Sequence, residues 1–408
     1  MKRVVITGMG ILSPIGNDFA TIENNLRQKK SGIEKIDELR QYNGMKIFVG
    51  GRVKDINFKE IPRSLRKVMG PQAIFAVLAT KKAIANAKLD MDNIDKRRIS
   101  IACSSTMGSA EGTYDFVATF IKGNGTTEHK PTSFFKMFPH TNSASIAMYF
   151  GIKGRIFSPA AACASALQSI GMGYENIKHG LTEVMICGGA EECHIIPNAM
   201  FQLLNTVSDN FNDDPHRSSR PFDIERRGLV IGEGAGILIL EELEHALNRG
   251  AEIYAEVVGY STTSNGEAMS TPSVEDMSVC MSQSLDDAGL KATDVNYVNG
   301  HFTATVVGDQ FESKAIGNLF GNRIPVGSLK GFMGHTLGAS GSIESIICML
   351  MMKNGFIAPN INLDNLDPEC AKLNYNTEVL NISPDIILKN SFAMGGINCS
   401  IVYKKFEK

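Results

Sequence analysis

The chain has 408 residues, a formal net charge of −2, 43% hydrophobic residues and 21% charged residues. These values are typical of a globular protein, and the balanced charge excludes nucleic-acid or membrane-surface binding driven by bulk positive charge. Length predicts two or three domains or one large layered body. Every apolar run is shorter than the roughly 20 residues of a membrane span. The N-terminus is predicted to be a strand and not a secretory signal, because its apolar part is too short.

Strand-like apolar runs alternate with segments of helical periodicity, which predicts an α/β fold with buried sheets. Strands are predicted at residues 3–7, 98–103, 184–188, 235–241, 252–260, 295–299, 324–327, 385–392 and 399–404. Helices are predicted at about 18–29, 72–88, 143–150, 164–179, 275–289, 309–319 and 340–353. Residues 208–223 are expected to form a long loop, and a short helix at 241–250 closes one half. We therefore place a boundary near residue 250, between residues 1–250 and 251–408.

Eight cysteines are scattered along the chain without a CxxC pair or the spacing of a metal-binding cage. Several fall in apolar runs, as reduced buried thiols do in proteins of the cytosol. The cysteine pattern predicts a cytoplasmic protein without a structural metal cage.

Cys163 lies in a run of small residues, 158–168, directly before a predicted helix. A helix N-terminus offers free backbone N–H groups and the positive end of the helix dipole, and both lower the pKa of a thiol. A cysteine among alanines is also a common small buried hydrophobe. This stretch alone leaves both interpretations open.

Three further segments carry chemically active residues at strand ends or in glycine-rich loops. Residues 297–305 present His301, and residues 327–341 present Lys330 and His335. Residues 390–398 end in a Gly-Gly turn, where backbone amides can face a ligand. Each segment alone also fits a structural loop. Together with Cys163 they form a nucleophile with acid/base groups.

In this order the residues resemble the beta-ketoacyl-acyl-carrier-protein synthases, closest to the type II elongating enzyme of bacterial fatty-acid synthesis. The resemblance covers essentially the whole chain, and its motifs include residues 4–16, 219–223, 232–236 and 395–398. It implies the thiolase fold, in which two pseudo-symmetric α/β halves stack in five αβαβα layers. The nucleophilic cysteine would lie in the N-terminal half, residues 1–250. The two histidines and the lysine would lie in the C-terminal half, residues 251–408.

The resemblance also implies the reaction, a decarboxylative Claisen condensation. Cys163 would accept an acyl chain from acyl carrier protein, and malonyl carrier protein would then lose carbon dioxide and extend the chain by two carbons. His301 and His335 would donate hydrogen bonds to the malonyl thioester oxygen. Backbone N–H groups of Cys163 and Met394 would hold the oxyanion of acyl transfer. The implied partners are acyl carrier protein and a second subunit, as a homodimer or as a heterodimer with a chain-length-factor-like homologue.

The remaining site residues follow from the same resemblance. Lys330 would tune the histidines and pair with Glu344 or Asp309, with Glu312 as a further supporting residue. Thr303 and Thr305 would bind the phosphopantetheine arm of the carrier protein, and no other cofactor is required. Two further sets are less specific. A buried cation site, or equally an internal Asn–Glu hydrogen-bond network, is formed by Asn299, Glu344, the Lys389 carbonyl and Asn390. A docking patch for the acidic carrier, or simply a solvated helix face, is formed by Arg63, Arg66 and Lys67.

The sequence departs from the family pattern at four places. Phe302 replaces glycine after the first histidine, and Ala304 stands between the two threonines. Residues 226–229 read Arg-Arg-Gly-Leu. In the gate that follows Phe392, Ala393 and Met394 replace a hinge glycine and a phenylalanine. Methionine is a more adaptable gate than phenylalanine, and alanine would restrict the hinge if that position needs a positive φ. We hypothesise an unusual acyl chain, such as an aryl or polyene intermediate of a specialised type II pathway.

Three other classes compete with this interpretation. A non-catalytic chain-length-factor subunit has the same fold but lacks the nucleophile, so Cys163 argues against it. A degradative thiolase uses a second catalytic cysteine near the C-terminus, whereas Cys399 is expected to pack in the core. A binding or scaffold protein would need no such set of residues.

Overall fold

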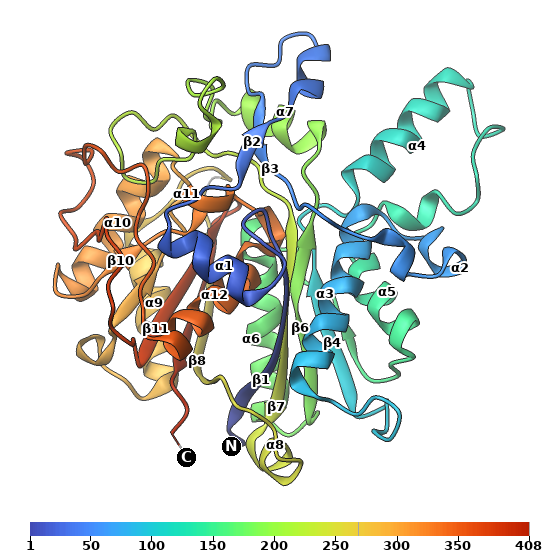
Figure 1. Cartoon of the computed structure of the whole chain (residues 1–408). Coiled ribbons are helices and arrows are strands. Elements are labelled where there is room, and N and C mark those ends of the chain that lie inside the picture. Colours follow the sequence, from blue (N-terminus) through green and yellow to red (C-terminus); the bar gives the residue numbers. More distant parts are fainter. Residues whose placement is uncertain (268, 408) are drawn as a thin grey trace.

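The computed structural model describes residues 1–267 and 269–407 (Figure 1). Within them, ten strands form one continuous sheet built from two half-sheets. In spatial order the first half-sheet holds β1 (Val4–Leu12), β7 (Gly234–Glu242), β6 (Val184–Glu191), β4 (Ile99–Ser104) and β5 (Ile156–Phe157). The second holds β8 (Ala255–Ser264), β12 (Ile397–Lys404), β11 (Ile386–Ala393), β9 (Tyr297–Asn299) and β10 (Val326–Gly327). A separate small sheet pairs β2 (Ile33–Lys35) with β3 (Val49–Gly51).

The two half-sheets repeat one topology. In the first, β1–β7 and β7–β6 are antiparallel, whereas β6–β4 and β4–β5 are parallel. In the second, β8–β12 and β12–β11 are antiparallel, whereas β11–β9 and β9–β10 are parallel. A short antiparallel pairing of residues 4–6 with 255–257 joins them. This repetition is the pseudo-symmetry that the resemblance implied, and the division near residue 250 itself stays a prediction.

Helices cover the half-sheets in layers (Figure 1). α3 (Pro71–Ala87) and α5 (Thr141–Phe150) pack on the outer face of the first, and α9 (Val274–Ala288) and α10 (Val306–Phe320) lie outside the second. Between the sheets lie α6 (Ser165–Lys178) and α12 (Ser340–Asn354), and both contact strands of both halves. The order is therefore αβαβα, which confirms the predicted thiolase fold. The other helices are α1 (Phe19–Arg27), α2 (Arg63–Arg66), α4 (Ala110–Lys122), α7 (Ile195–Leu203), α8 (Leu243–Asn248) and α11 (Lys330–Met333).

The composition of α12 explains its central position. Every residue from Ser340 to Met352 is buried. A helix with apolar and small residues on all sides is stable only where protein surrounds it. The small residues of its first turn also leave room for the turn that carries Cys163, which packs against α12.

Several predicted boundaries were wrong. The strand predicted at 3–7 extends to Leu12 despite two glycines, which are unfavourable inside strands. A Cβ atom at Gly10 would lie 2.0 Å from the carbonyl oxygen of Ala79, so the glycine lets α3 approach the strand. α10 begins at Val306, three residues earlier than predicted, and β8 begins at Ala255 and runs on to Ser264. The elements that the pattern missed are β2, β3, β5, α2, α4, α7 and α11.

The predicted central loop and the buried, reduced cysteines are both found in the structure. Residues 208–223 form a loop with one 3₁₀ turn at Pro215–Arg217. All eight cysteines are buried and free in the described part of the chain. No helix within the described ranges combines the length and the hydropathy needed to cross a bilayer.

Candidate active site

Cys163 lies at a tight turn that enters α6. The 3₁₀ turn Ala162–Ala164 directly precedes the helix, and Ala162 has a φ of 47°. This left-handed residue turns the chain sharply, and the Cys163 side chain lines a cavity of about 490 Å³. Only 7% of Cys163 is exposed, so the thiol is reached through the cavity.

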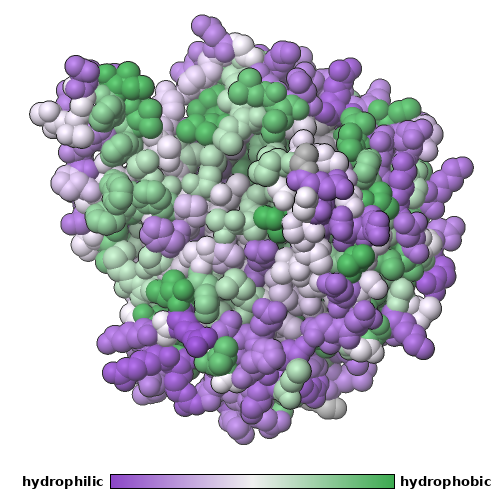
Figure 2. Space-filling view, turned by 180° about the vertical axis from the view of Figure 1, so that it is seen from behind, coloured by the Kyte–Doolittle hydropathy of each residue, from purple (hydrophilic) through white to green (hydrophobic). Residues whose placement is uncertain are grey.

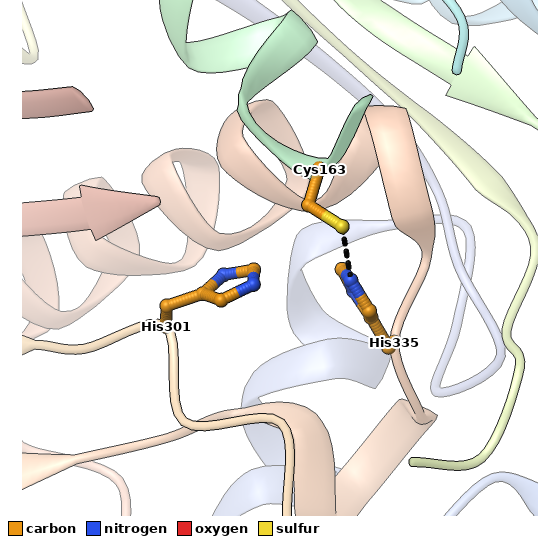
Figure 3. Close-up of side chains that lie close together, drawn as sticks. All are labelled: Cys163, His301 and His335. Atoms are coloured by element: carbon orange, nitrogen blue, oxygen red, sulfur yellow. Dashed lines mark hydrogen bonds between the residues drawn. The ribbon is translucent and has the colours of Figure 1, made fainter. Parts of the chain in front are cut away.

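The structure brings both predicted histidines to this thiol (Figure 3). His301 follows β9, and His335 lies between α11 and α12. Nε2 of His335 is 2.9 Å from Sγ of Cys163. The two imidazole rings lie edge to face, with centroids 5.0 Å apart and an interplanar angle of 83°. Both histidines line the same cavity as the thiol.

Burial dominates the electrostatics of this cluster. It raises the pKa of the Cys163 thiol to about 12, although Lys330 and the backbone N–H groups of Cys163 and Met394 act to lower it. The sequence pattern suggested that the helix start would lower the pKa of this thiol. In the structure the cost of burying a thiolate outweighs that effect, so the helix start does not produce a resting thiolate. Burial, followed by the charge of Lys330, holds the pKa of both His301 and His335 well below 6.5. The resting site at neutral pH holds a thiol and two neutral imidazoles.

A serine orients His335. Nδ1 of His335 is 2.8 Å from Oγ of Ser340, the first residue of α12. When this hydroxyl donates to Nδ1, the ring proton lies on Nε2 and faces the sulfur. The sequence interpretation missed Ser340, although its place five residues after His335, at a helix start, was visible.

Lys330 is fully buried and pairs with Glu344, one of its two predicted partners, at 2.7 Å. The other candidate, Asp309, contacts Arg226 at 3.4 Å and accepts hydrogen bonds from the backbone N–H groups of Phe222 and Ala304. Arg226 and not Lys330 is therefore the cation beside Asp309.

Glu312 supports the segment that carries the first histidine. Its carboxylate oxygens accept hydrogen bonds from the backbone N–H groups of His301 at 2.7 Å and Phe302 at 2.6 Å. Burial raises the pKa of Glu312 to about 7, against the effect of these hydrogen bonds. The carboxyl group fixes the start of the loop in which His301 lies.

The predicted arm-binding and gate residues lie along the cavity. Thr303 and Thr305 line it, and their hydroxyl oxygens are 2.9 Å apart. Phe392, Ala393 and Met394 line it as well. Ala393, the last residue of β11, does not have a positive φ, so the methyl group imposes no left-handed strain at the hinge. Met394 is 41% exposed, at the rim.

The other departures from the family pattern have structural consequences. Phe302 is buried and packs edge to face on Phe222, with ring centroids 4.4 Å apart. Ala304 has a φ of 65°, which is unfavourable for a residue with a Cβ atom. Arg227 lines the cavity, a position that the sequence interpretation did not assign to the site.

The residues of the suggested cation site also lie together. Asn299, Glu344, Lys389 and Asn390 are all fully buried. Lys389 on β11 pairs with Asn299 on the neighbouring parallel strand β9. The side chain of Lys389 enters this cluster, whereas the sequence interpretation considered only its carbonyl group. A lysine inside an apolar strand was the signal that could have revealed it.

The predicted docking residues lie elsewhere. Arg63 and Arg66 belong to α2, and Lys67 follows it. Arg63 and Lys67 are exposed and Arg66 is half-buried. None of the three lines the cavity among the residues described. Cys399, the candidate second nucleophile, is fully buried in β12 and also lies away from the cavity lining.

The thiol and the two imidazoles also form a potential metal-donor set. Their sulfur and nitrogen atoms lie within 4.8 Å of one another. Two zinc ligands of this kind in a tetrahedral site would be roughly 3.5 Å apart, given usual Zn–S and Zn–N distances. The 2.9 Å contact between Cys163 and His335 is shorter, which favours a direct hydrogen bond between them.

Comparison with known proteins places this site among condensing enzymes. Residues 1–246 match the family model "Beta-ketoacyl synthase, N-terminal domain", and residues 254–364 match "Beta-ketoacyl synthase, C-terminal domain". The chain is 37% identical to a 3-oxoacyl-[acyl-carrier-protein] synthase 1 of Haemophilus influenzae, over 100% of both chains. It resembles the crystal structure of a beta-ketoacyl synthase from Burkholderia phymatum, with a TM-score of 0.96, 38% identity and full coverage of both chains. A ketosynthase in complex with its type II polyketide acyl-carrier protein gives a TM-score of 0.92 at 30% identity, again over 100% of both chains.

Proposed function

Because this chain belongs to the beta-ketoacyl synthase family, we propose that it condenses an acyl group on Cys163 with a malonyl group carried by acyl carrier protein. The observation that carries the proposal is the contact of Cys163 with His335, with His301 in the same cavity. The product is a 3-oxoacyl-acyl carrier protein, two carbons longer than the acyl group.

The first step transfers the acyl group to Cys163. The sulfur attacks the thioester carbonyl carbon on the phosphopantetheine arm, a new C–S bond forms and the old C–S bond breaks. The Nε2–H group of His335 donates a hydrogen bond to the sulfur as it attacks, and the thiol proton passes to the departing pantetheine sulfur, so no net charge remains in the buried site. The backbone N–H groups of Cys163 and Met394 both lie at the sulfur. In this position they stabilise the oxyanion that forms on the carbonyl oxygen.

The second step is decarboxylation of the bound malonyl group. The bond between its α carbon and its carboxylate breaks, carbon dioxide leaves, and the electron pair forms an enolate. The enolate oxygen accepts hydrogen bonds from His301 and His335. Both imidazoles are neutral, since burial and Lys330 oppose their protonation. Each such preorganised donor contributes roughly 3–4 kcal/mol to transition-state stabilisation.

The third step forms the carbon–carbon bond. The enolate carbon attacks the acyl carbonyl on Cys163, the C–S bond breaks, and the sulfur leaves as a thiolate that takes up one proton from solvent water through the cavity. Thr303 and Thr305, which line the cavity, hold the arm through their hydroxyl groups. Lys330 stays paired with Glu344 throughout and contributes its charge without touching the substrate.

Intact mass spectrometry tests this proposal directly. The protein is incubated with acyl carrier proteins loaded with saturated, unsaturated and aryl chains. We expect a mass gain equal to the acyl group, which Cys163→Ala abolishes and the buried-cysteine control Cys399→Ala retains. No gain with any carrier, or a gain that persists in Cys163→Ala, contradicts the proposal.

Two versions of this function differ in the acyl chain that the enzyme extends. Fatty-acid elongation is the first version, and it matches the names of the full-length relatives. A specialised type II pathway with polyene, aryl or polyketide chains is the second, and Met394 at the cavity rim favours it. The acyl groups that Cys163 retains in the same mass spectra distinguish the two.

We also propose that the active form is a homodimer. β5 is one of the two edge strands of the sheet, and its Ile156 is 48% exposed. Apolar side chains gather at the upper left of Figure 2, the side of the molecule where α4 lies. The exposed apolar residues of α4 and of the chain from there to α5 include Val117, Phe120, Ile121, Phe134, Phe135, Phe138 and Met148. A two-fold axis would place β5 against β5 of a second copy and cover this face.

Light scattering after size-exclusion chromatography tests the homodimer. The protein alone should have twice the chain mass, and Ile156→Lys should halve it, whereas Leu181→Lys, at another exposed apolar residue, should not. A monomer that pairs only with a co-expressed homologous chain would contradict the homodimer and support a heterodimer.

Docking of acyl carrier protein on Arg63, Arg66 and Lys67 is the remaining partner proposal. Their combined exchange to alanine should weaken carrier binding in a salt-dependent way.

A further inference from the structure

Lys389 is an unusual residue for the centre of a sheet. It lies in β11, between Leu388 and Asn390, with strands on both sides. Its exposed fraction is 0%, and it is among the largest fully buried side chains of the protein. A buried ammonium is costly unless it is paired and hydrogen-bonded, so its partners should show what it does.

Among the residues that the structure describes, the hydrogen-bond and ion-pair partners of the Lys389 ammonium are oxygen atoms. Nζ lies 2.6 Å from Oε2 of Glu344 and donates a hydrogen bond to the carbonyl oxygen of Asn390. The other oxygen of Glu344, Oε1, lies 2.7 Å from Nζ of Lys330. One buried carboxylate therefore bridges two buried ammonium groups.

The side-chain oxygen of Asn299 belongs to the same buried cluster as the ammonium of Lys389. Asn299 is the register partner of Lys389 on β9, and the side chains of paired residues point to the same face of a sheet. Oδ1 of Asn299 is buried and has no hydrogen-bond partner among the residues that the structure describes. A carboxylate, a backbone carbonyl and an amide oxygen are the donors that hard cations bind in proteins.

These residues do not fit a free cation as well as the lysine. The suggested cation site uses Glu344, Asn299, Asn390 and the carbonyl group of Lys389, and the ammonium of Lys389 already contacts Glu344 and Asn390. A metal ion in the same cluster would lie against an ammonium group of the same charge. The protein therefore carries its own cation where the resemblance suggested a bound ion.

The charge reaches the catalytic histidines. Lys389, together with Lys330, opposes protonation of both His301 and His335. Lys389 does not line the cavity that contains Cys163, so it acts through Glu344 and Lys330 and is a positioning residue. Without its charge, Glu344 would have a single cationic partner, and the position of Lys330, whose charge acts on both histidines, would be less fixed.

We propose that the ammonium of Lys389 is a covalently attached substitute for a monovalent metal ion, which makes the enzyme independent of potassium and sodium. The catalytic part of this inference rests on the proposed condensing function, whereas its structural part does not. Exchange of the lysine for a small residue should open an oxygen-lined space that accepts potassium.

The experiment compares the full-length protein in potassium chloride and in tetramethylammonium chloride at equal ionic strength. The melting temperature and the rate of malonyl-acyl carrier protein decarboxylation are both measured. Wild type should give the same values in the two salts. Lys389→Ser should lose activity and melt earlier in tetramethylammonium, and potassium should restore both, with roughly a tenfold gain in rate.

Two variants complete the design. Lys389→Met removes the charge but fills the space, so it should be impaired and potassium should not rescue it. Lys405→Ser removes an exposed lysine that pairs with Asp385 on the surface, and it should behave like wild type in both salts. Rescue of Lys389→Ser alone would identify the space left by Lys389 as the ion site.

Two results would overturn the proposal. One is stimulation of wild type by potassium. The other is a Lys389→Ser variant whose melting temperature is the same in both salts, including one that is unfolded in both. The melting temperature also separates the two proposals. A potassium-dependent melting temperature in a protein that never acylates Cys163 would support the role of Lys389 and contradict the condensing function.

Discussion

Nε2 of His335 lies 2.9 Å from Sγ of Cys163, and the opposite ring nitrogen of the same histidine lies 2.8 Å from Oγ of Ser340. Cys163 comes from the first half of the chain, whereas His335 and Ser340 come from the second. One nitrogen of His335 therefore faces the first residue of α12, and the other faces the 3₁₀ turn that precedes α6.

Loss of the Ser340 hydroxyl should slow catalysis more than it weakens binding. In Ser340→Ala the ring proton of His335 is no longer held on Nε2, so kcat should fall about tenfold with little change in KM. Steady-state kinetics with malonyl carrier protein measure both. Ser342→Ala is the matched control, because Ser342 is buried in the same helix and bonds only to the carbonyl oxygen of Ala339. Equal losses in both variants would show that Ser340 acts through packing alone.

Glu344→Gln should destabilise the whole fold. The change leaves the buried ammonium groups of Lys330 and Lys389 without a counter-charge, and breaking a buried pair in this way costs about 3–5 kcal/mol. Urea unfolding gives the free energy of unfolding. Glu252→Gln removes the partner of the exposed Lys353 and should cost about 0–1 kcal/mol. A loss that small in Glu344→Gln would contradict the charge-bridging role of Glu344.

Met394→Phe should change the preferred acyl chain. A phenylalanine at the cavity rim is bulkier and stiffer than methionine, so the ratio of kcat/KM for polyunsaturated over saturated chains should fall about tenfold. Competition between the two carriers, read by mass spectrometry, measures this ratio. Leu203→Phe, at an exposed position of α7 outside the cavity lining, serves as control. An unchanged ratio in Met394→Phe would show that Met394 does not determine which acyl chain is preferred.

Glu192→Gln should reduce the loss of stability toward alkaline pH. Burial raises the pKa of Glu192 to about 8, although the backbone N–H of Glu111 at the start of α4 acts to lower it. A raised pKa means that folding takes up a proton at Glu192. The contribution of this proton to the free energy of unfolding is fully present below about pH 4.5 and is lost as the pH rises through about 8. The change in the free energy of unfolding is on the order of 5 kcal/mol. Melting temperatures from pH 5 to 9 should be flatter in Glu192→Gln than in wild type or in the exposed control Glu244→Gln. The same dependence of melting temperature on pH in all three proteins would contradict this role of Glu192.

Much of the fold followed from periodicity, because long buried strands and helices give strong patterns. The strand β6 and the helix α6, for example, lie within a few residues of their predicted ranges. α4 was missed because its apolar residues, such as Phe120 and Ile121, face outward and give no core-facing pattern. β2 and β3 have only three residues each, too few for a period to be recognised.

In the candidate site, too, some features could be predicted from the sequence and others could not. Cys163, His301 and His335 follow from motifs, because reactive residues at strand ends and glycine-rich loops are visible in sequence. The pKa of Cys163 could not be predicted from its helix start, because burial depends on the packing of both halves around it. The head group of Lys389 could not be placed either, since Asn299 and Glu344 come from distant segments that only the sheet and α12 bring together.

The middle layer has a consequence for motion. Since α6 lies between two sheets, its amide protons should exchange with solvent only when the molecule unfolds globally, whereas those of the rim turn at Gly395 should exchange through local openings. We therefore expect the turn that carries Cys163 to open last and the turn at Met394 and Gly395 to open first. The cavity entrance would then widen for a bulky chain while the sulfur atom keeps its position beside the two histidines.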